Sequence, residues 1–103
     1  MKGVNMEIRY LRIVVDKDKS EDLALRLCSK HLSAICSVID SITHEWVGGQ
    51  LVQKFNKLID AVTCKKDYEE IYNLLKEYNA HVVNITDVES VDYDYNNWFK
   101  NGV

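Results

Sequence analysis

The sequence predicts an α+β fold in the order β-α-α-α-β, in which a long first helix forms a helical bundle or hairpin packed on a small sheet. Strand-like runs of β-branched residues lie near both ends, and a long helical spacing of apolar residues lies between them. The chain has 103 residues, 47% of them hydrophobic, which suits a single domain with its own core. We therefore treat 1–103 as one α+β domain, and we interpret 1–5 as a leader or a cloning remnant.

The first strand is predicted over residues 6–15, which read MEIRYLRIVV. Its second half is apolar at successive positions, which is typical of a strand covered on both faces. Ser20 follows a polar connector and is predicted to be a helix N-cap, because Glu21 and Asp22 come next, where the helix dipole favours acids.

The strongest pattern predicts one helix over residues 21–47. Apolar side chains alternate at spacings of three and four, as in a coiled-coil seam: Leu25, Cys28, Leu32, Ile35, Ile39, Ile42 and Trp46. We interpret this seam as core or as a dimer contact. The helix would carry more apolar surface than its shorter neighbours can cover, so we predict a homodimer. Gly48-Gly49 ends the helix.

Two shorter helices and a second strand are predicted beyond these glycines. Residues 50–63 carry a second seam at Leu51, Phe55, Leu58 and Val62. Asp67 and Glu70 match a capping box for a helix to Tyr78, with Asn79 as a left-handed C-cap. Residues 81–88 form the second strand, parallel to the first if successive elements alternate in direction. The segment 92–103 stays open between an edge strand, a short helix and an ordered tail.

The C-terminal third combines acids with aromatic rings. Residues 67–103 contain two basic and eight acidic residues, while the whole chain has a net charge of −3. Such a segment suits a protein partner with a basic surface, because aromatic side chains supply contact area and acids supply charge complementarity. The predicted partner-binding residues are Asp87, Glu89, Asp92, Tyr93, Asp94, Tyr95, Trp98 and Phe99.

Catalytic and metal-binding signals are weak. Cys28 and His31 lie three residues apart, close enough to share a metal ion, but the remaining ligands are not arranged to complete a site. We interpret Cys28 as a core residue, and we assign no catalytic residue, metal or cofactor. The basic side chains of residues 54–66 could contact phosphates, but the acidic chain makes nucleic acid the less favoured partner.

These observations favour binding over catalysis. We predict a small acidic cytoplasmic module that inhibits or regulates a basic, nucleic-acid-handling protein, similar in physical type to phage inhibitors and immunity proteins. The alternative is a homodimeric nucleic-acid-binding regulator that uses residues 54–66, and the third is a small enzyme or metal protein around Cys28 and His31. No apolar run approaches membrane-spanning length, and no secretion signal precedes the first strand, so we predict reduced cysteines and no membrane contact.

Overall fold

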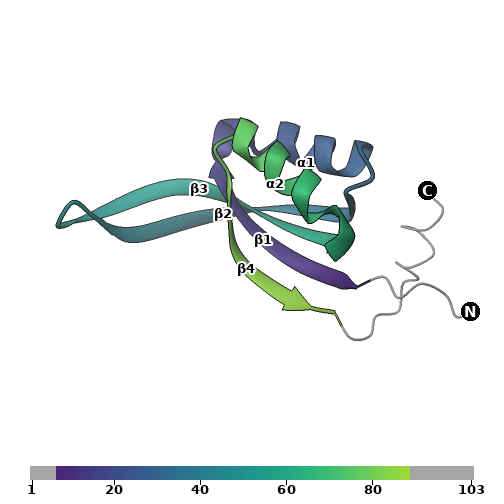
Figure 1. Ribbon diagram of the computed structural model, residues 1–103. Coiled ribbons are helices and arrows are strands. Elements are labelled where there is room, and N and C mark those ends of the chain that lie inside the picture. Colours follow the sequence, from purple (N-terminus) through teal and green to yellow (C-terminus); the bar gives the residue numbers. More distant parts are fainter. Residues whose placement is uncertain (1–6, 89–103) are drawn as a thin grey trace, which may run out of the picture.

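A computed structural model describes residues 7–88 of the chain as two helices on a four-stranded sheet (Figure 1). The elements follow one another as β1 (Ile8–Asp16), α1 (Ser20–Ser29), β2 (Ser33–Val47), β3 (Gln50–Cys64), α2 (Tyr68–Glu77) and β4 (His81–Asp87). Short 3-10 turns, η1 (Lys17–Lys19) and η2 (Lys65–Asp67), lead into the two helices.

The sheet has the strand order β2-β3-β1-β4, and every neighbouring pair runs antiparallel. Both helices lie over the same face of this sheet (Figure 1). A β-α-β-β-α-β chain with this strand order is the ferredoxin-like arrangement. The opposite face of the sheet is not covered by any described helix.

The core lies between the helices and the sheet. Alternate residues of β1 point toward the helices, so Leu11, Ile13 and Val15 are buried while the residues between them are more exposed. The buried cluster is completed by side chains of α1, β3, α2 and the segments that follow the helices: Leu23, Ala24, Leu27, Leu32, Ile59, Ala61, Ile71, Leu74, Leu75, Tyr78 and Ala80.

The predicted long helix over residues 21–47 is wrong. Helix α1 ends at Ser29, His31 takes a left-handed φ of 59°, and the chain continues as strand β2. Residues 33–47 are rich in β-branched side chains, which favour strands. The helical spacing is coincidental, because Ile35 and Ile39 lie on one face of β2 while Ile42 and Trp46 lie on the other.

The predicted helix over residues 50–63 is also wrong, for the same reason. These residues form β3, which pairs with β2 from Val47↔Gln50 to Ser33↔Thr63. Gly48 and Gly49 close the hairpin with φ of 57° and 81°, which is the left-handed pair of a two-residue type I′ turn. The glycines therefore do not separate two helices but join two strands.

The hairpin of β2 and β3 occupies residues that were expected to be helical, and the added element reverses the direction of β4 relative to β1. The predicted parallel pair of end strands is wrong, because β1 and β4 are antiparallel neighbours. A bulge between Arg12 and Ile13 shifts their register. Residues 7–88 thus supply four strands of the sheet, and the segment 92–103 lies outside the described residues.

The local predictions around the second helix fare better. Helix α2 covers Tyr68–Glu77, and Asn79 has the predicted left-handed φ, at 53°. The capping details differ, because Asp67 occupies the N-cap position without a side-chain capping bond. Ser20 likewise lies inside α1, and its hydroxyl donates to the Lys17 carbonyl at 3.0 Å.

The β2–β3 hairpin extends far beyond the helices (Figure 1), and the molecule measures 55 Å along its longest axis and 24 and 23 Å across the others. We call the projecting part, between Asp40 and Lys57, the arm. Neither described helix is long and apolar enough to cross a membrane.

Candidate self-association surface

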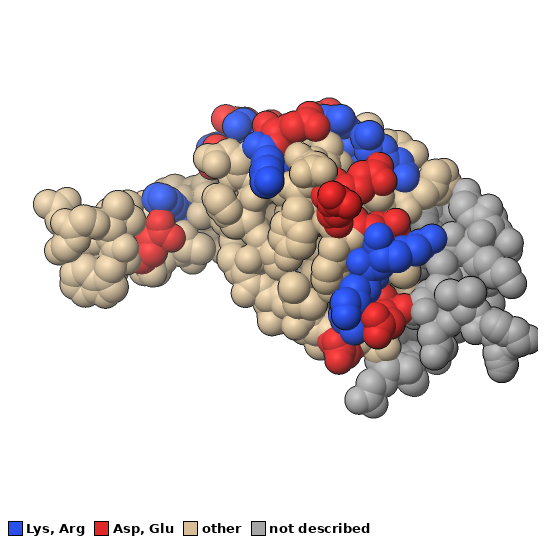
Figure 2. Space-filling model, in the orientation of Figure 1, with Lys and Arg blue, Asp and Glu red and all other residues tan. Residues whose placement is uncertain are grey.

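One face of the arm is a row of large apolar side chains. Strand pairing sets Ile42 opposite Phe55 and Trp46 opposite Leu51, which places all four on the same face. Their exposed fractions are 57%, 64%, 75% and 61%. Figure 2 shows the arm, at the left, as largely uncharged surface. The pair of His44 and Gln53 lies between the two apolar pairs on this face. Four large exposed apolar side chains on one face of a short hairpin are typical of a contact surface.

The other face of the arm carries paired polar side chains, together with Val47 and Val52 near the tip. Lys54 Nζ lies 2.8 Å from Glu45 Oε1, and Asn56 Nδ2 donates to Thr43 Oγ1 at 3.1 Å. The Glu45 carboxylate raises the pKa of Lys54 through a hydrogen bond and its charge. The arm is therefore amphipathic, with one face suited to water and one suited to another apolar surface.

The open face of the sheet is a second partly apolar surface. It lies opposite the helices and joins the base of the arm. Cross-strand pairing brings together side chains of β1, β2 and β3 there, among which Val62 is buried and the others are half-buried or exposed: Tyr10, Val14, Ile35, Ile39, Leu58 and Val62.

An ion pair lies in the middle of this open face. Arg12 Nε and Nη2 donate to the two carboxylate oxygens of Asp60 at 2.8 and 3.0 Å, in the bidentate geometry that guanidinium and carboxylate favour. Arg12 keeps 43% of its side chain exposed, whereas Asp60 keeps only 6%. The Arg12 hydrogen bonds lower the pKa of Asp60, against the opposing effect of burial. Burial is the largest cause that raises the pKa of Tyr10, and the hydrogen bond with Asp60 and its charge raise it further.

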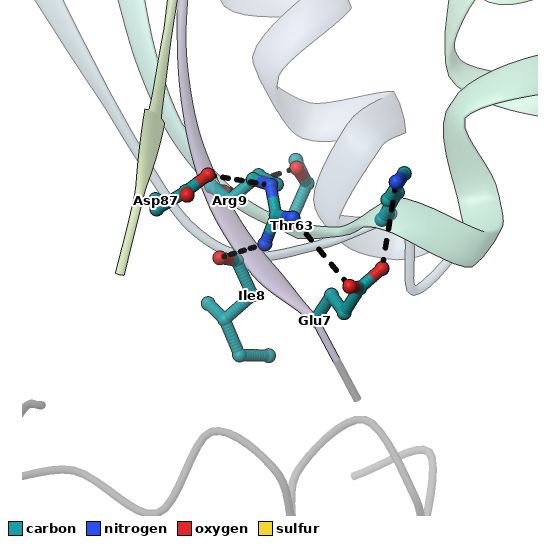
Figure 3. A network of polar contacts seen from close by, with 6 residues as sticks. Glu7, Ile8, Arg9, Thr63 and Asp87 are labelled. Atoms are coloured by element: carbon teal, nitrogen blue, oxygen red, sulfur yellow. Dashed lines mark hydrogen bonds and ion pairs between the residues drawn. The ribbon is translucent and has the colours of Figure 1, made fainter. Parts of the chain in front are cut away.

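A polar network closes the end of the sheet far from the arm (Figure 3). Arg9 Nε lies 2.9 Å from Asp87 Oδ1 on β4, and Arg9 Nη2 lies 3.7 Å from Glu7 Oε1. Thr63 Oγ1 donates to the Arg9 carbonyl at 3.1 Å, and Lys65 Nζ lies 3.6 Å from Glu7 Oε2. These contacts join β4 and β3 to β1, so the network stabilises the pairing of the strands at this end of the sheet.

The structure places one predicted partner-binding residue in this network. Asp87 is exposed but paired with Arg9, so its charge is already partly balanced. The other predicted partner-binding residues lie outside the described residues: Glu89, Asp92, Tyr93, Asp94, Tyr95, Trp98 and Phe99. The basic-surface partner thus stays a prediction.

The structure does not bring the predicted seam residues together. Leu25 is 68% exposed on the outer side of α1, whereas Leu32 is buried after the helix. Ile35 and Ile39 lie on the open sheet face, and Ile42 and Trp46 lie on the opposite face of the arm. The strand period would have revealed both surfaces, because the same residues read with a period of two separate into these two sets.

The remaining candidate residues also differ from expectation. Three lysines of the basic stretch are paired with acids: Lys54 with Glu45, Lys57 with Asp40 and Lys65 with Glu7. They do not form a free basic face. Within residues 7–88, no group of three or more His, Cys, Asp and Glu side chains is arranged to hold a metal ion, which includes Cys28 and His31.

Comparison with known proteins identifies the fold. No protein-family model and no curated protein matches the sequence. Solved structures do match. CutA1 from Oryza sativa has a TM-score of 0.82 at 17% identity, over 93% of this chain and 93% of that one. CutA from Synechococcus elongatus has a TM-score of 0.81 at 13% identity, over 94% and 90% of the two chains.

A third match carries a functional description. It is the periplasmic divalent cation tolerance protein CutA from Archaeoglobus fulgidus, with a TM-score of 0.79 at 16% identity, over 91% of this chain and 96% of that one. The likeness contradicts the predicted inhibitor or regulator of a basic protein, and it lends no support to the nucleic-acid-binding alternative or to an enzyme or metal protein around Cys28 and His31. The chain has the CutA fold.

Proposed function

We propose that this protein is a non-enzymatic homo-oligomer of the CutA kind that acts in divalent cation tolerance, with copies joined through the arm and the open sheet face. The fold likeness to proteins named for divalent cation tolerance supports the cation part. The exposed apolar side chains on one face of the arm support the proposed assembly.

A comparison of the free energy of apolar burial with the cost of association favours a contact that uses both the arm and the open sheet face. Burying a large apolar side chain contributes about 1.5–3 kcal/mol, so the four side chains of the arm contribute roughly 6–12 kcal/mol when fully covered. Association itself costs about 4–15 kcal/mol in lost freedom. The arm alone is therefore close to break-even, and the half-buried residues of the open face supply the surplus.

The shape of the molecule favours a second copy as the occupant. Each chain presents one projecting arm and one sheet face that no described helix covers (Figure 1). An arm laid on the face of a neighbour is a head-to-tail contact, and such contacts close into rings when the rotation between copies permits. β2 is also an edge strand of the sheet, so its unpaired backbone groups can be protected by the same contact.

The cytoplasm is the compartment that we propose. Cys28, Cys36 and Cys64 are free thiols, which persist in a reducing environment. The Archaeoglobus fulgidus protein is described as periplasmic, so fractionation of producing cells is the measurement that decides for this chain.

Sedimentation equilibrium tests the assembly. The wild type should give a mass of at least two 12.0 kDa chains. Trp46→Ser combined with Phe55→Ser should shift the mass toward one chain. Leu25→Ser is the matched control, because it removes an equally exposed leucine from α1, away from both surfaces. A wild-type mass of one chain at micromolar concentration contradicts the assembly.

Growth in elevated divalent cations tests the cation part separately. Producing the wild type in a bacterial strain that lacks its own CutA should restore growth at cation concentrations that inhibit that strain. The arm variant is the control for the role of assembly and should restore growth less well. If the folded, assembled wild type restores no growth, the cation part is wrong while the assembly stands.

A further inference from the structure

A histidine lies in the middle of the apolar face of the arm. Strand pairing sets His44 opposite Gln53, and both side chains are exposed in the single chain. The cross-strand pairs on either side of them, on the same face, are apolar: Ile42 with Phe55, and Trp46 with Leu51. A neighbouring molecule that covers these four apolar side chains therefore covers His44 as well.

The carboxylates of the arm are already paired with lysines. Asp40 lies on the same face as His44, at the base of the arm, and forms an ion pair with Lys57. Glu45 lies on the other face, where its Oε1 atom is 2.8 Å from Lys54 Nζ. These two are the acidic residues of the arm. A proton on His44 would therefore give the apolar face a positive charge that no unpaired carboxylate of the arm balances.

The open sheet face, on which the arm of a second copy would lie, also lacks an unpaired carboxylate in its middle. Asp60 is 6% exposed and binds Arg12, which is 43% exposed. Tyr10 lies beside this ion pair, and β4 adds His81 opposite Val14. At the border of the face, the Asp16 carboxylate already acts on Lys54 of its own chain. Among the described residues, the middle of this face thus offers His44 a cation rather than a free acid.

We propose that His44 makes the assembly sensitive to pH: copies associate while its ring is neutral, and they separate as the pH falls and the ring gains a proton. This inference rests on the proposed assembly through the arm. Moving a charged group out of water costs free energy unless an opposite charge compensates it. Covering His44 therefore favours its neutral form, so the separate chains bind more protons than the assembled ones and association weakens in acid.

The size of the effect follows from the linkage between proton binding and association. Histidine is the side chain that changes its charge between about pH 8 and pH 5. The neutral fraction of an exposed histidine falls about tenfold between pH 7.5 and pH 5.5. The dissociation constant should therefore rise about tenfold over this range for each His44 that is covered. Aspartate and glutamate ordinarily titrate near pH 4, so their charges change little in the same range.

Sedimentation velocity over a dilution series, at pH 7.5 and at pH 5.5, tests the proposal. The wild type should dissociate about tenfold more readily at pH 5.5 for each covered His44. His44→Gln is neutral at both pH values and should remove this difference. His31→Gln and His81→Gln are the matched controls, because they remove the other two histidines of the chain, and both should keep the wild-type response. The proposal is overturned if His44→Gln keeps that response or if His81→Gln loses it.

A permanent charge provides a second variant. His44→Lys should assemble poorly at both pH values and should unfold in urea like the wild type, because residue 44 is exposed in the single chain. Assembly of His44→Lys as tight as that of the wild type at pH 7.5 also overturns the proposal. A wild type that assembles equally well at both pH values overturns this inference alone. A wild type that is a single chain at pH 7.5 overturns the proposed assembly and this inference with it.

Discussion

Trp46 and Leu51 face each other across the β2–β3 hairpin, with only a short turn around Gly48 and Gly49 beyond them. Both side chains are mostly exposed, Trp46 at 75% and Leu51 at 61%. A cross-strand pair of this kind stabilises the tip of the hairpin, and it also presents an apolar end to a neighbouring molecule. A change in the turn at Gly48 and Gly49 would therefore also change how the hairpin tip contacts another chain.

The glycine turn gives the first prediction. A Cβ at Gly48 would meet no atom within 4 Å, so any cost of substitution comes from the backbone φ of 57°. Gly48→Val should destabilise the chain by about 1–3 kcal/mol, because β-branched residues resist left-handed backbone. Gly48→Asn should cost only a few tenths of a kcal/mol, because Asn is favoured at this turn position. Urea unfolding measures both, and equal stability of the two variants contradicts the turn.

Two leucines of α1 give the second prediction. Leu27 is fully buried, whereas Leu25 is exposed on the same helix. Leu27→Ala should cost about 2–5 kcal/mol of unfolding free energy from lost burial and the cavity left behind. Leu25→Ala should stay within about 0.5 kcal/mol of the wild type. The reverse order would mean that α1 presents its other side to the sheet.

The pair of Arg12 and Asp60 gives a pH-dependent prediction. Asp60→Asn should lower stability at pH 7 by about 1.5 kcal/mol, because it removes the charge from two hydrogen bonds. Since the folded pKa of Asp60 is lowered, this advantage is fully present above its ordinary value of about 3.9 and is lost as the pH falls through the folded pKa.

The measurement is the unfolding free energy of the wild type and of Asp60→Asn between pH 3 and pH 7. The two curves should converge toward the acid end of that range. A constant difference at every pH would show that the effect of the substitution does not come from the Asp60 charge.

The contact between the helices gives the fourth prediction. The buried Tyr78 hydroxyl donates to Asp22 of α1, and Arg26 Nη1 donates to the same hydroxyl at 3.0 Å. Tyr78→Phe should therefore cost about 1 kcal/mol, which lowers the melting temperature by about 4–8 °C in a domain of this size. Tyr72→Phe is the control, because Tyr72 is exposed on α2 and its ring contact with Tyr68 needs no hydroxyl. Equal melting temperatures for the two variants would contradict a stabilising role for the Tyr78 hydroxyl.

How far the sequence predicts the fold depends on the length of each apolar pattern. The end strands and α2 lie close to their predicted positions, because their patterns are short and bounded by polar or capping residues. The helical prediction over residues 33–64 is wrong, because apolar residues are so frequent there that helical spacings of three and four fit as well as the strand spacing of two. A Gly-Gly pair between two β-branched runs is a hairpin signal, and it resolves this ambiguity.

The functional surfaces depend on that same assignment. An excess of apolar surface was visible in the sequence, and the expectation of self-association follows from it with either assignment. The distribution of residues over the two faces differs between the helix and strand assignments, because Ile39 and Ile42 lie on one side of a helix but on opposite sides of a strand.

The accessibility of Trp46 tests the central claim, assembly through the arm, most directly. In a single chain this side chain is 75% exposed, whereas in the proposed assembly a neighbouring copy covers it. Trp98→Phe leaves Trp46 as the one tryptophan of the sequence, so acrylamide quenching of its fluorescence reports on the arm alone. The account predicts weak quenching in the assembled protein and several-fold stronger quenching when Phe55→Ser is added. Equally strong quenching in both proteins would contradict assembly through the arm.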